Sequence, residues 1–61
     1  MSVQNFESIV SAALGRKVKA EKRTAKNGKT ERWEIRANGY LFVPYKNSVA
    51  YCHNGNWVIP A

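Results

Sequence analysis

The chain has 61 residues, of which 44% are hydrophobic, and its formal net charge is +6 at pH 7. A chain of this length forms a single domain, 1–61, with a modest core, which argues against a deep substrate cavity. Its two Trp, three Tyr and two Phe residues argue against a disordered basic tail.

Cysteine content and hydropathy bear on the compartment. Cys52 is the only cysteine, so an internal disulfide is excluded, and small secreted domains usually contain several. No segment approaches the roughly 20 consecutive apolar residues that a membrane span needs, and the N-terminus has no pattern of a cationic start followed by a long apolar run. We therefore expect a cytoplasmic protein without membrane association.

The first element predicted along the chain is a helix over about residues 3–14. Apolar side chains recur there at the spacing of one helical face, at Phe6, Ile9, Val10, Ala13 and Leu14. Ser2 is placed to cap the helix N-terminus, and Gly15 to end it in a left-handed conformation. The opposite face is polar, with Glu7, Ser8 and Ser11. Such a helix needs a hydrophobic surface on which to pack.

The remainder, about residues 17–60, is predicted to be a β-meander. Three Asn-Gly pairs, at Asn27, Asn38 and Asn54, separate segments with strand character, and Asn-Gly favours the type I′ turn of a tight hairpin. A further tight turn is expected at Lys46-Asn47. The fold class is therefore α+β, with one amphipathic helix packed on a curved antiparallel sheet of four to five strands. Partial closure into a small barrel is one form that this sheet can take.

Pairing the strands about these turns predicts which residues share a face, because side chains alternate along a strand. Ile35 falls opposite Ala20 on one side and Phe42 on the other, and Tyr51 falls opposite Phe42. The predicted inner face, which the helix covers, comprises Val18, Ala20, Trp33, Ile35, Tyr40, Phe42, Val49, Tyr51 and Val58. The register of the fourth strand stays open, since a longer loop at Lys46-Asn47 would exchange its faces.

The predicted outer face changes character across the sheet. In the first hairpin it places like charges opposite each other, which costs stability unless a diagonal neighbour or a bound anion compensates. These pairs are Lys19 with Arg36, Arg23 with Arg32, and Glu21 with Glu34. In the later strands the same face is apolar, with Leu41, Val43, Tyr45, Ala50, Cys52, Trp57 and Ile59. This apolar half needs to be shielded from water. Closure of the sheet or formation of a homo-oligomer is favoured over binding of a different protein.

The positive charge is concentrated between residues 16 and 36, where nine Lys and Arg residues stand against three Glu residues. A two-stranded ribbon of this charge is suited to following a phosphate backbone or entering a major groove. We therefore predict binding of DNA or RNA through Lys17, Lys19, Arg23, Lys26, Lys29, Arg32 and Arg36. Tyr45 and Trp57 are candidates for base stacking or for an interface.

Two other interpretations of the charge remain open. A solvated basic face can serve solubility alone. Alternatively, the protein is an interaction module, such as a small inhibitor or adaptor encoded by a mobile element, whose basic hairpin docks on an acidic protein surface.

The sequence contains no enzymatic or metal-binding signature. Cys52 and His53 are adjacent in a predicted strand, so they point to opposite faces and do not form a nucleophile and base pair. The chain has no second His or Cys to complete a metal site. We expect a non-enzymatic protein without cofactor or metal.

Overall fold

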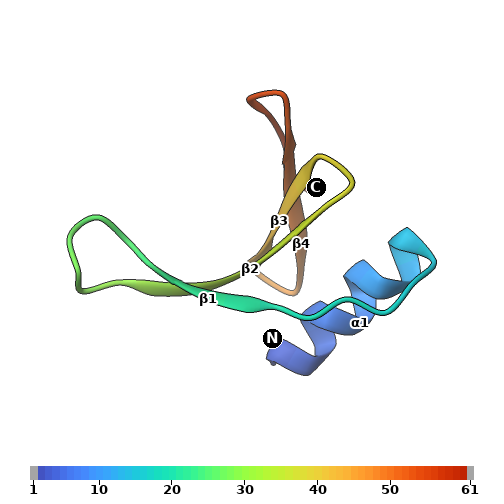
Figure 1. Cartoon of the computed structure of the whole chain (residues 1–61), viewed down its shortest axis with the longest axis horizontal. Coiled ribbons are helices and arrows are strands. Elements are labelled where there is room, and N and C mark those ends of the chain that lie inside the picture. Colours follow the sequence, from blue (N-terminus) through green and yellow to red (C-terminus); the bar gives the residue numbers. More distant parts are fainter. Residues whose placement is uncertain (1, 61) are drawn as a thin grey trace.

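The computed structural model describes residues 2–60 and contains one helix packed on a five-stranded antiparallel sheet (Figure 1). The elements in chain order are α1 (Val3–Leu14), β1 (Glu21–Thr24), β2 (Glu31–Ala37), β3 (Tyr40–Tyr45), β4 (Ser48–His53) and β5 (Asn56–Val58). The strands lie in sequence order from β1 to β5. The predicted α+β class is confirmed. The sheet is not closed into a barrel, because β1 and β5 form its two edges.

Both predicted ends of the helix are confirmed. The Ser2 hydroxyl accepts a hydrogen bond from the Asn5 N–H at 3.1 Å, which satisfies one of the free donors at the helix N-terminus. Gly15 adopts a left-handed φ of 72°, and its N–H donates to the Ser11 carbonyl at 2.9 Å. Phe6 and Val10 are the buried side chains of the helix.

The core lies between α1 and the inner face of the sheet. Phe6 and Val10 pack there with Ile35 and Phe42, and these four side chains are buried. Partly buried residues surround them, namely Leu14, Val18, Ala20, Trp33, Ala37, Tyr40, Val49 and Tyr51. The predicted inner face is confirmed for β2, β3 and β4. Val58 keeps its predicted place opposite Tyr51 but is 48% exposed in the edge strand β5, and Val18 and Ala20 pack against the core from a segment outside the sheet.

The strand registers agree with those predicted around the turns. Lys22 pairs with Trp33, Ile35 pairs with Phe42, and Phe42 pairs with Tyr51. The register of the fourth strand, which the sequence left open, is decided by a tight turn at Lys46-Asn47 that places Tyr45 opposite Ser48. The faces of β4 are therefore not exchanged.

The Asn-Gly pairs form two kinds of turn. At Asn38-Gly39 and Asn54-Gly55 both residues have positive φ, between 53° and 80°, as a type I′ turn requires.

The loop at Asn27-Gly28 is different, and the prediction of a type I′ turn there is wrong. The Ala25 N–H donates to the Thr30 carbonyl, the Gly28 N–H donates to the Ala25 carbonyl, and only Gly28 of the Asn-Gly pair has positive φ. The Asn27 Oδ1 accepts from the N–H groups of Lys29 and Thr30 and holds this wider loop. The loop is centred on the same point of the chain, so the β1–β2 register is unchanged.

Residues 17–20 do not join the sheet, contrary to the prediction of a strand from about residue 17. Two of their backbone donors bond to the helix instead: the Val18 N–H donates to the Ser11 hydroxyl at 3.1 Å, and the Ala20 N–H donates to Glu7 Oε2 at 2.7 Å. The predicted strand pairs of Val18, Lys19 and Ala20 with β2 are therefore absent. Glu7 and Ser11, predicted on a solvent-facing side of α1, tie the helix to the segment that follows it.

The outer face of the sheet is buried at its centre and exposed at β5 and at the residue that follows it. Ala50 and Glu34 are each 2% exposed, whereas Trp57 and Ile59 are 47% and 54% exposed. The cover expected for the apolar outer half is thus missing at β5 within the described chain.

The turn at Lys46 generates a prediction for stability. Lys46 has a φ of 53°, which is unfavourable for a residue with a long side chain and better tolerated by Asn. We expect Lys46→Asn to raise the free energy of unfolding by about 0.5 to 1 kcal/mol in urea denaturation. Lys46→Gln is the control, since it also removes the contact of the Lys46 ammonium with the Tyr45 ring but keeps the strain. Equal stabilities of the two variants would contradict this account.

The bond from Ala20 to Glu7 generates a second prediction. Glu7→Ala leaves the partly buried Ala20 N–H without its acceptor, so we expect the free energy of unfolding to fall by about 1 kcal/mol. Glu7→Gln retains an acceptor oxygen, so its free energy of unfolding should fall by less than that of Glu7→Ala. Thermal and urea unfolding measure both variants, and a loss for Gln as large as that for Ala would show that the hydrogen bond does not matter.

Candidate nucleic-acid interface

The first hairpin extends away from the helix and the other strands (Figure 1). We call residues 21–33, which comprise β1, the loop at 25–30 and the start of β2, the basic arm. All residues of β1 and of the loop are exposed, as are Glu31 and Arg32. Burial begins at Trp33 and Glu34, where β2 enters the body of the protein. A partner can therefore reach both faces of the basic arm.

A positively charged depression lies on the outer face of the arm and continues along β2 to Glu34 and Arg36. Its charged lining residues are Arg23, Lys26, Arg32, Glu34 and Arg36. Arg23 and Arg32 are direct partners across the hairpin, and Arg36 follows Arg32 on the same face of β2. Four cations stand against one carboxylate, which leaves a net charge of +3 in this depression.

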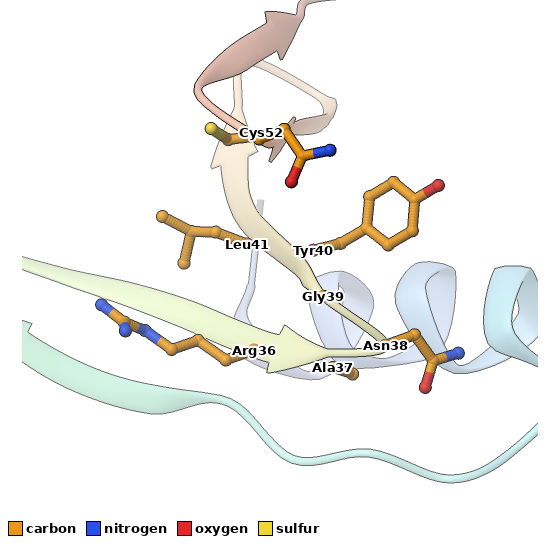
Figure 2. A pocket seen from close by; sticks show the side chains of 8 residues that line it. Arg36, Ala37, Asn38, Gly39, Tyr40, Leu41 and Cys52 are labelled. Carbon is orange, nitrogen blue, oxygen red and sulfur yellow. The ribbon is translucent and has the colours of Figure 1, made fainter.

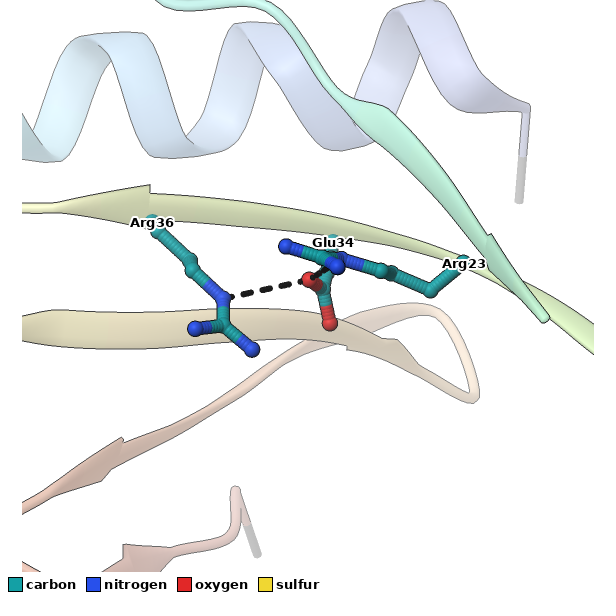
Figure 3. Close-up of polar contacts among 3 residues, drawn as sticks. All are labelled: Arg23, Glu34 and Arg36. Carbon is teal, nitrogen blue, oxygen red and sulfur yellow. Dashed lines mark hydrogen bonds and ion pairs between the residues drawn. The ribbon is translucent and has the colours of Figure 1, made fainter. Parts of the chain in front are cut away.

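Glu34 lies at the inner end of the depression between two arginines (Figure 3). Its Oε1 accepts hydrogen bonds from the Nε of Arg23 at 2.6 Å and from the Nε of Arg36 at 3.2 Å. Glu34 is paired with Glu21 across the strands, so Arg23 is the diagonal neighbour that the like-charge pairs required. The carboxylate is buried, and both arginine side chains are more than half exposed.

The reverse face of the arm carries less free charge. Lys22 forms an ion pair with Glu31 at 3.0 Å, and its Nζ lies 5.5 Å from the centroid of the Trp33 ring. The ammonium of Lys22 is thus engaged by a carboxylate and an aromatic ring. The two faces of the arm therefore differ, and the outer one is lined by Lys26 and Arg32, which form no ion pair with another residue of the range 2–60.

The other predicted binding residues are distributed around the molecule. Lys29 lies in the loop at the end of the arm, where its N–H bonds to the Asn27 side chain. Lys17 and Lys19 lie beside α1, in a separate depression that Glu7 and Ser11 also line. The structure thus brings together Arg23, Lys26, Arg32 and Arg36, but not Lys17 and Lys19.

The two candidate aromatic residues have different surroundings. Trp57 ends a row of cross-strand neighbours on the outer face, Arg36 to Leu41 to Cys52 to Trp57. Figure 2 shows Arg36, Leu41 and Cys52 projecting to one side of the bent sheet, away from Tyr40. Tyr45 is half-buried at the β3–β4 turn, with the Lys46 Nζ 5.4 Å from its ring centroid. Only Trp57 is therefore exposed and connected by this row to the basic depression.

Reasoning from the sequence overlooked Glu34 as a central residue of the site. A signal was present, because Arg32, Glu34 and Arg36 alternate along β2 and so project from one face. The sequence shows this alternation, but burial of the carboxylate depends on the curvature of the sheet.

Cys52 and His53 lie on opposite faces of β4, as the alternation predicts. His53 stacks on Tyr40 with a centroid distance of 4.5 Å, and Cys52 is a half-buried free thiol on the outer face. Within residues 2–60, no group of three or more His, Cys, Asp or Glu side chains is arranged to hold a metal ion. The same part of the chain contains no helix with the length and apolar character needed to cross a membrane.

Comparison with known proteins gives no relative of this chain: no family model, no curated protein and no solved structure matches it.

Proposed function

We propose that this protein binds nucleic acid through the outer face of the basic arm. The observation that supports this proposal is a protruding two-stranded arm whose outer depression carries a net charge of +3. Lys and Arg side chains that contact phosphates release condensed counterions, and this release drives association at low salt. A two-stranded ribbon is narrow enough to enter a major groove or to follow a single strand.

The outer face of the sheet beyond the arm favours binding of single-stranded over duplex nucleic acid. The row from Arg36 to Trp57 crosses three strand intervals, about 14 Å, so a chain that leaves the basic depression reaches Trp57 within a few nucleotides. An exposed indole is a stacking platform for an unpaired base, whereas the bases of a duplex are already stacked. We therefore propose that single-stranded DNA or RNA binds more tightly than the duplex of the same sequence.

A second candidate function is docking on an acidic protein surface, and the edge strand favours it. Trp57, Val58 and Ile59 are consecutive and each about half exposed at the edge of the sheet opposite the arm, where they offer apolar contact area while the arm steers association electrostatically. Purification of the tagged protein from its host with and without nuclease separates the two functions. A stoichiometric protein that survives nuclease treatment supports docking, and nuclease-sensitive nucleic acid supports the first proposal.

The first proposal predicts a steep dependence of affinity on salt. The logarithm of the association constant for an oligonucleotide should fall against the logarithm of salt concentration with a slope of about −3 to −5, as expected for about four or five phosphate contacts. Arg32→Gln should weaken binding and reduce the magnitude of this slope by about one. Fluorescence anisotropy with labelled DNA and RNA measures both quantities.

Arg16→Gln is the matched control for Arg32→Gln. It removes the same charge at the helix end, where Arg16 donates to the Asn38 side chain at 3.1 Å. Equal losses for the two variants would show that only net charge matters. Absence of binding to any single- or double-stranded probe at low salt would refute the proposal.

The role of Trp57 gives a further prediction. Trp57→Ala should weaken binding of a single strand by about tenfold, because one stacked base contributes about 1 to 3 kcal/mol. Binding of a duplex should change little. Ile59→Ala is the control, since Ile59 is similarly exposed but offers no aromatic face. A loss of the same size for duplex and single strand would count against stacking.

A further inference from the structure

We infer that Glu34 is a positioning residue, which holds Arg23 and Arg36 as a two-pronged site for one phosphate of the nucleic-acid backbone. This inference rests on the proposed function and deepens it, since it names the phosphate contact and the residue that orders it.

The geometry of the two ion pairs leaves the phosphate-binding ends of the arginines available. Both arginines use their Nε–H to reach the same oxygen, Glu34 Oε1. Neither guanidinium makes a hydrogen bond through its Nη groups to another residue in the described part of the chain. A guanidinium has five N–H donors, so the outward pairs stay free to bind two oxygens of a phosphate. Figure 3 shows the two side chains approaching Glu34 from opposite sides.

Burial differs between the two ends of this cluster. Glu34 is 2% exposed, whereas the side chains of Arg23 and Arg36 are 51% and 63% exposed. The anchoring carboxylate is therefore fixed inside the protein while the donors face solvent. Glu34 adjoins Ile35, which is itself 2% exposed in the core, so the backbone that carries the carboxylate is held by core packing.

Two physical effects of Glu34 on anion binding oppose each other. Its negative charge lowers the positive potential of the depression, which weakens attraction of a phosphate. Its hydrogen bonds order two long side chains before binding, which removes the entropy cost of ordering them in the complex. A buried ion pair is seldom more stabilising than an apolar residue of similar size, so fold stability alone is a weak reason for a carboxylate here. We infer that ordering outweighs the lost charge.

Because the two effects oppose each other, they predict opposite changes in affinity when the charge of Glu34 is removed. Glu34→Gln keeps the shape of the side chain and raises the net charge of the protein by one. Electrostatic attraction alone predicts tighter binding of a labelled oligothymidylate of about 15 nucleotides. The positioning role predicts binding that is about five- to tenfold weaker, because the arginines lose their charged anchor. Circular dichroism and thermal unfolding verify that the variant is folded.

Charge-conserving variants provide a second test that does not alter the buried carboxylate. Arg23→Lys and Arg36→Lys preserve the charge but lose the forked donor group, so each should weaken binding several-fold. Arg32→Lys is the matched control, since Arg32 lines the same depression without an ion pair to Glu34. Its affinity should stay close to that of the unchanged protein. An equal effect at all three positions would overturn the inference.

Titration with inorganic phosphate separates this inference from the proposed function. The Nε–H signals of Arg23 and Arg36 in proton–nitrogen NMR spectra should shift with phosphate, and Glu34→Gln should weaken this response. If these signals respond while no oligonucleotide binds, the phosphate site stands and the nucleic-acid proposal fails. If an oligonucleotide binds through the arm while Glu34→Gln binds equally well or better, the function stands and the positioning role is refuted. Absence of any phosphate response at the two arginines also refutes it.

Discussion

The alternation of side chains at residues 34–36 of β2 is the constraint on which the rest of the structure depends. Ile35 points toward α1 and packs with Phe6, Val10 and Phe42 in the core, while Glu34 and Arg36 point to the other face. One short stretch of backbone therefore belongs to both the core and the candidate site. Because close-packed core side chains resist displacement, the carboxylate that bonds the two arginines is held in position by packing on the opposite face of the same strand.

A second organising feature is the use of backbone donors between the helix and the sheet. Glu7 and Ser11 of α1 accept the N–H groups of Ala20 and Val18, so the chain after the helix runs along α1 and reaches the sheet only at Glu21. This arrangement shortens β1 and ties the helix to the start of the hairpin. It also divides the basic residues, because Lys17 and Lys19 remain beside the helix, whereas the cations of the outer depression are Arg23, Lys26, Arg32 and Arg36.

Part of the candidate site can be predicted from the pattern of charges in the sequence. The concentration of Lys and Arg between residues 16 and 36 is visible in the sequence, as is the alternation that sends Arg23, Arg32 and Arg36 to one face. The sequence does not show that Lys22 is engaged on the reverse face by Glu31 and Trp33, nor that Glu34 is buried. These features depend on side-chain contacts across strands and on the bend of the sheet, which local periodicity does not encode.

The sequence by itself determined the features that arise from neighbouring residues: the capped helix, the order of the strands and the registers around the Asn-Gly turns. The register of β4 was left open by the sequence and is decided by the tight turn at Lys46-Asn47. Turn chemistry at Asn38-Gly39 and Asn54-Gly55 and the periods of 3.6 and 2 are local properties, so they are readable without a structure. The form of the loop at Asn27-Gly28 is also local, since its hydrogen bonds stay within residues 25–30, but an Asn-Gly pair is compatible with more than one turn and the pattern does not select this one. Only the tertiary structure decided the path of residues 17–20, the exposure of Val58 and the burial of Glu34. Each of these depends on which donors, acceptors and apolar surfaces meet when distant segments pack together, and more than one arrangement satisfies the local pattern.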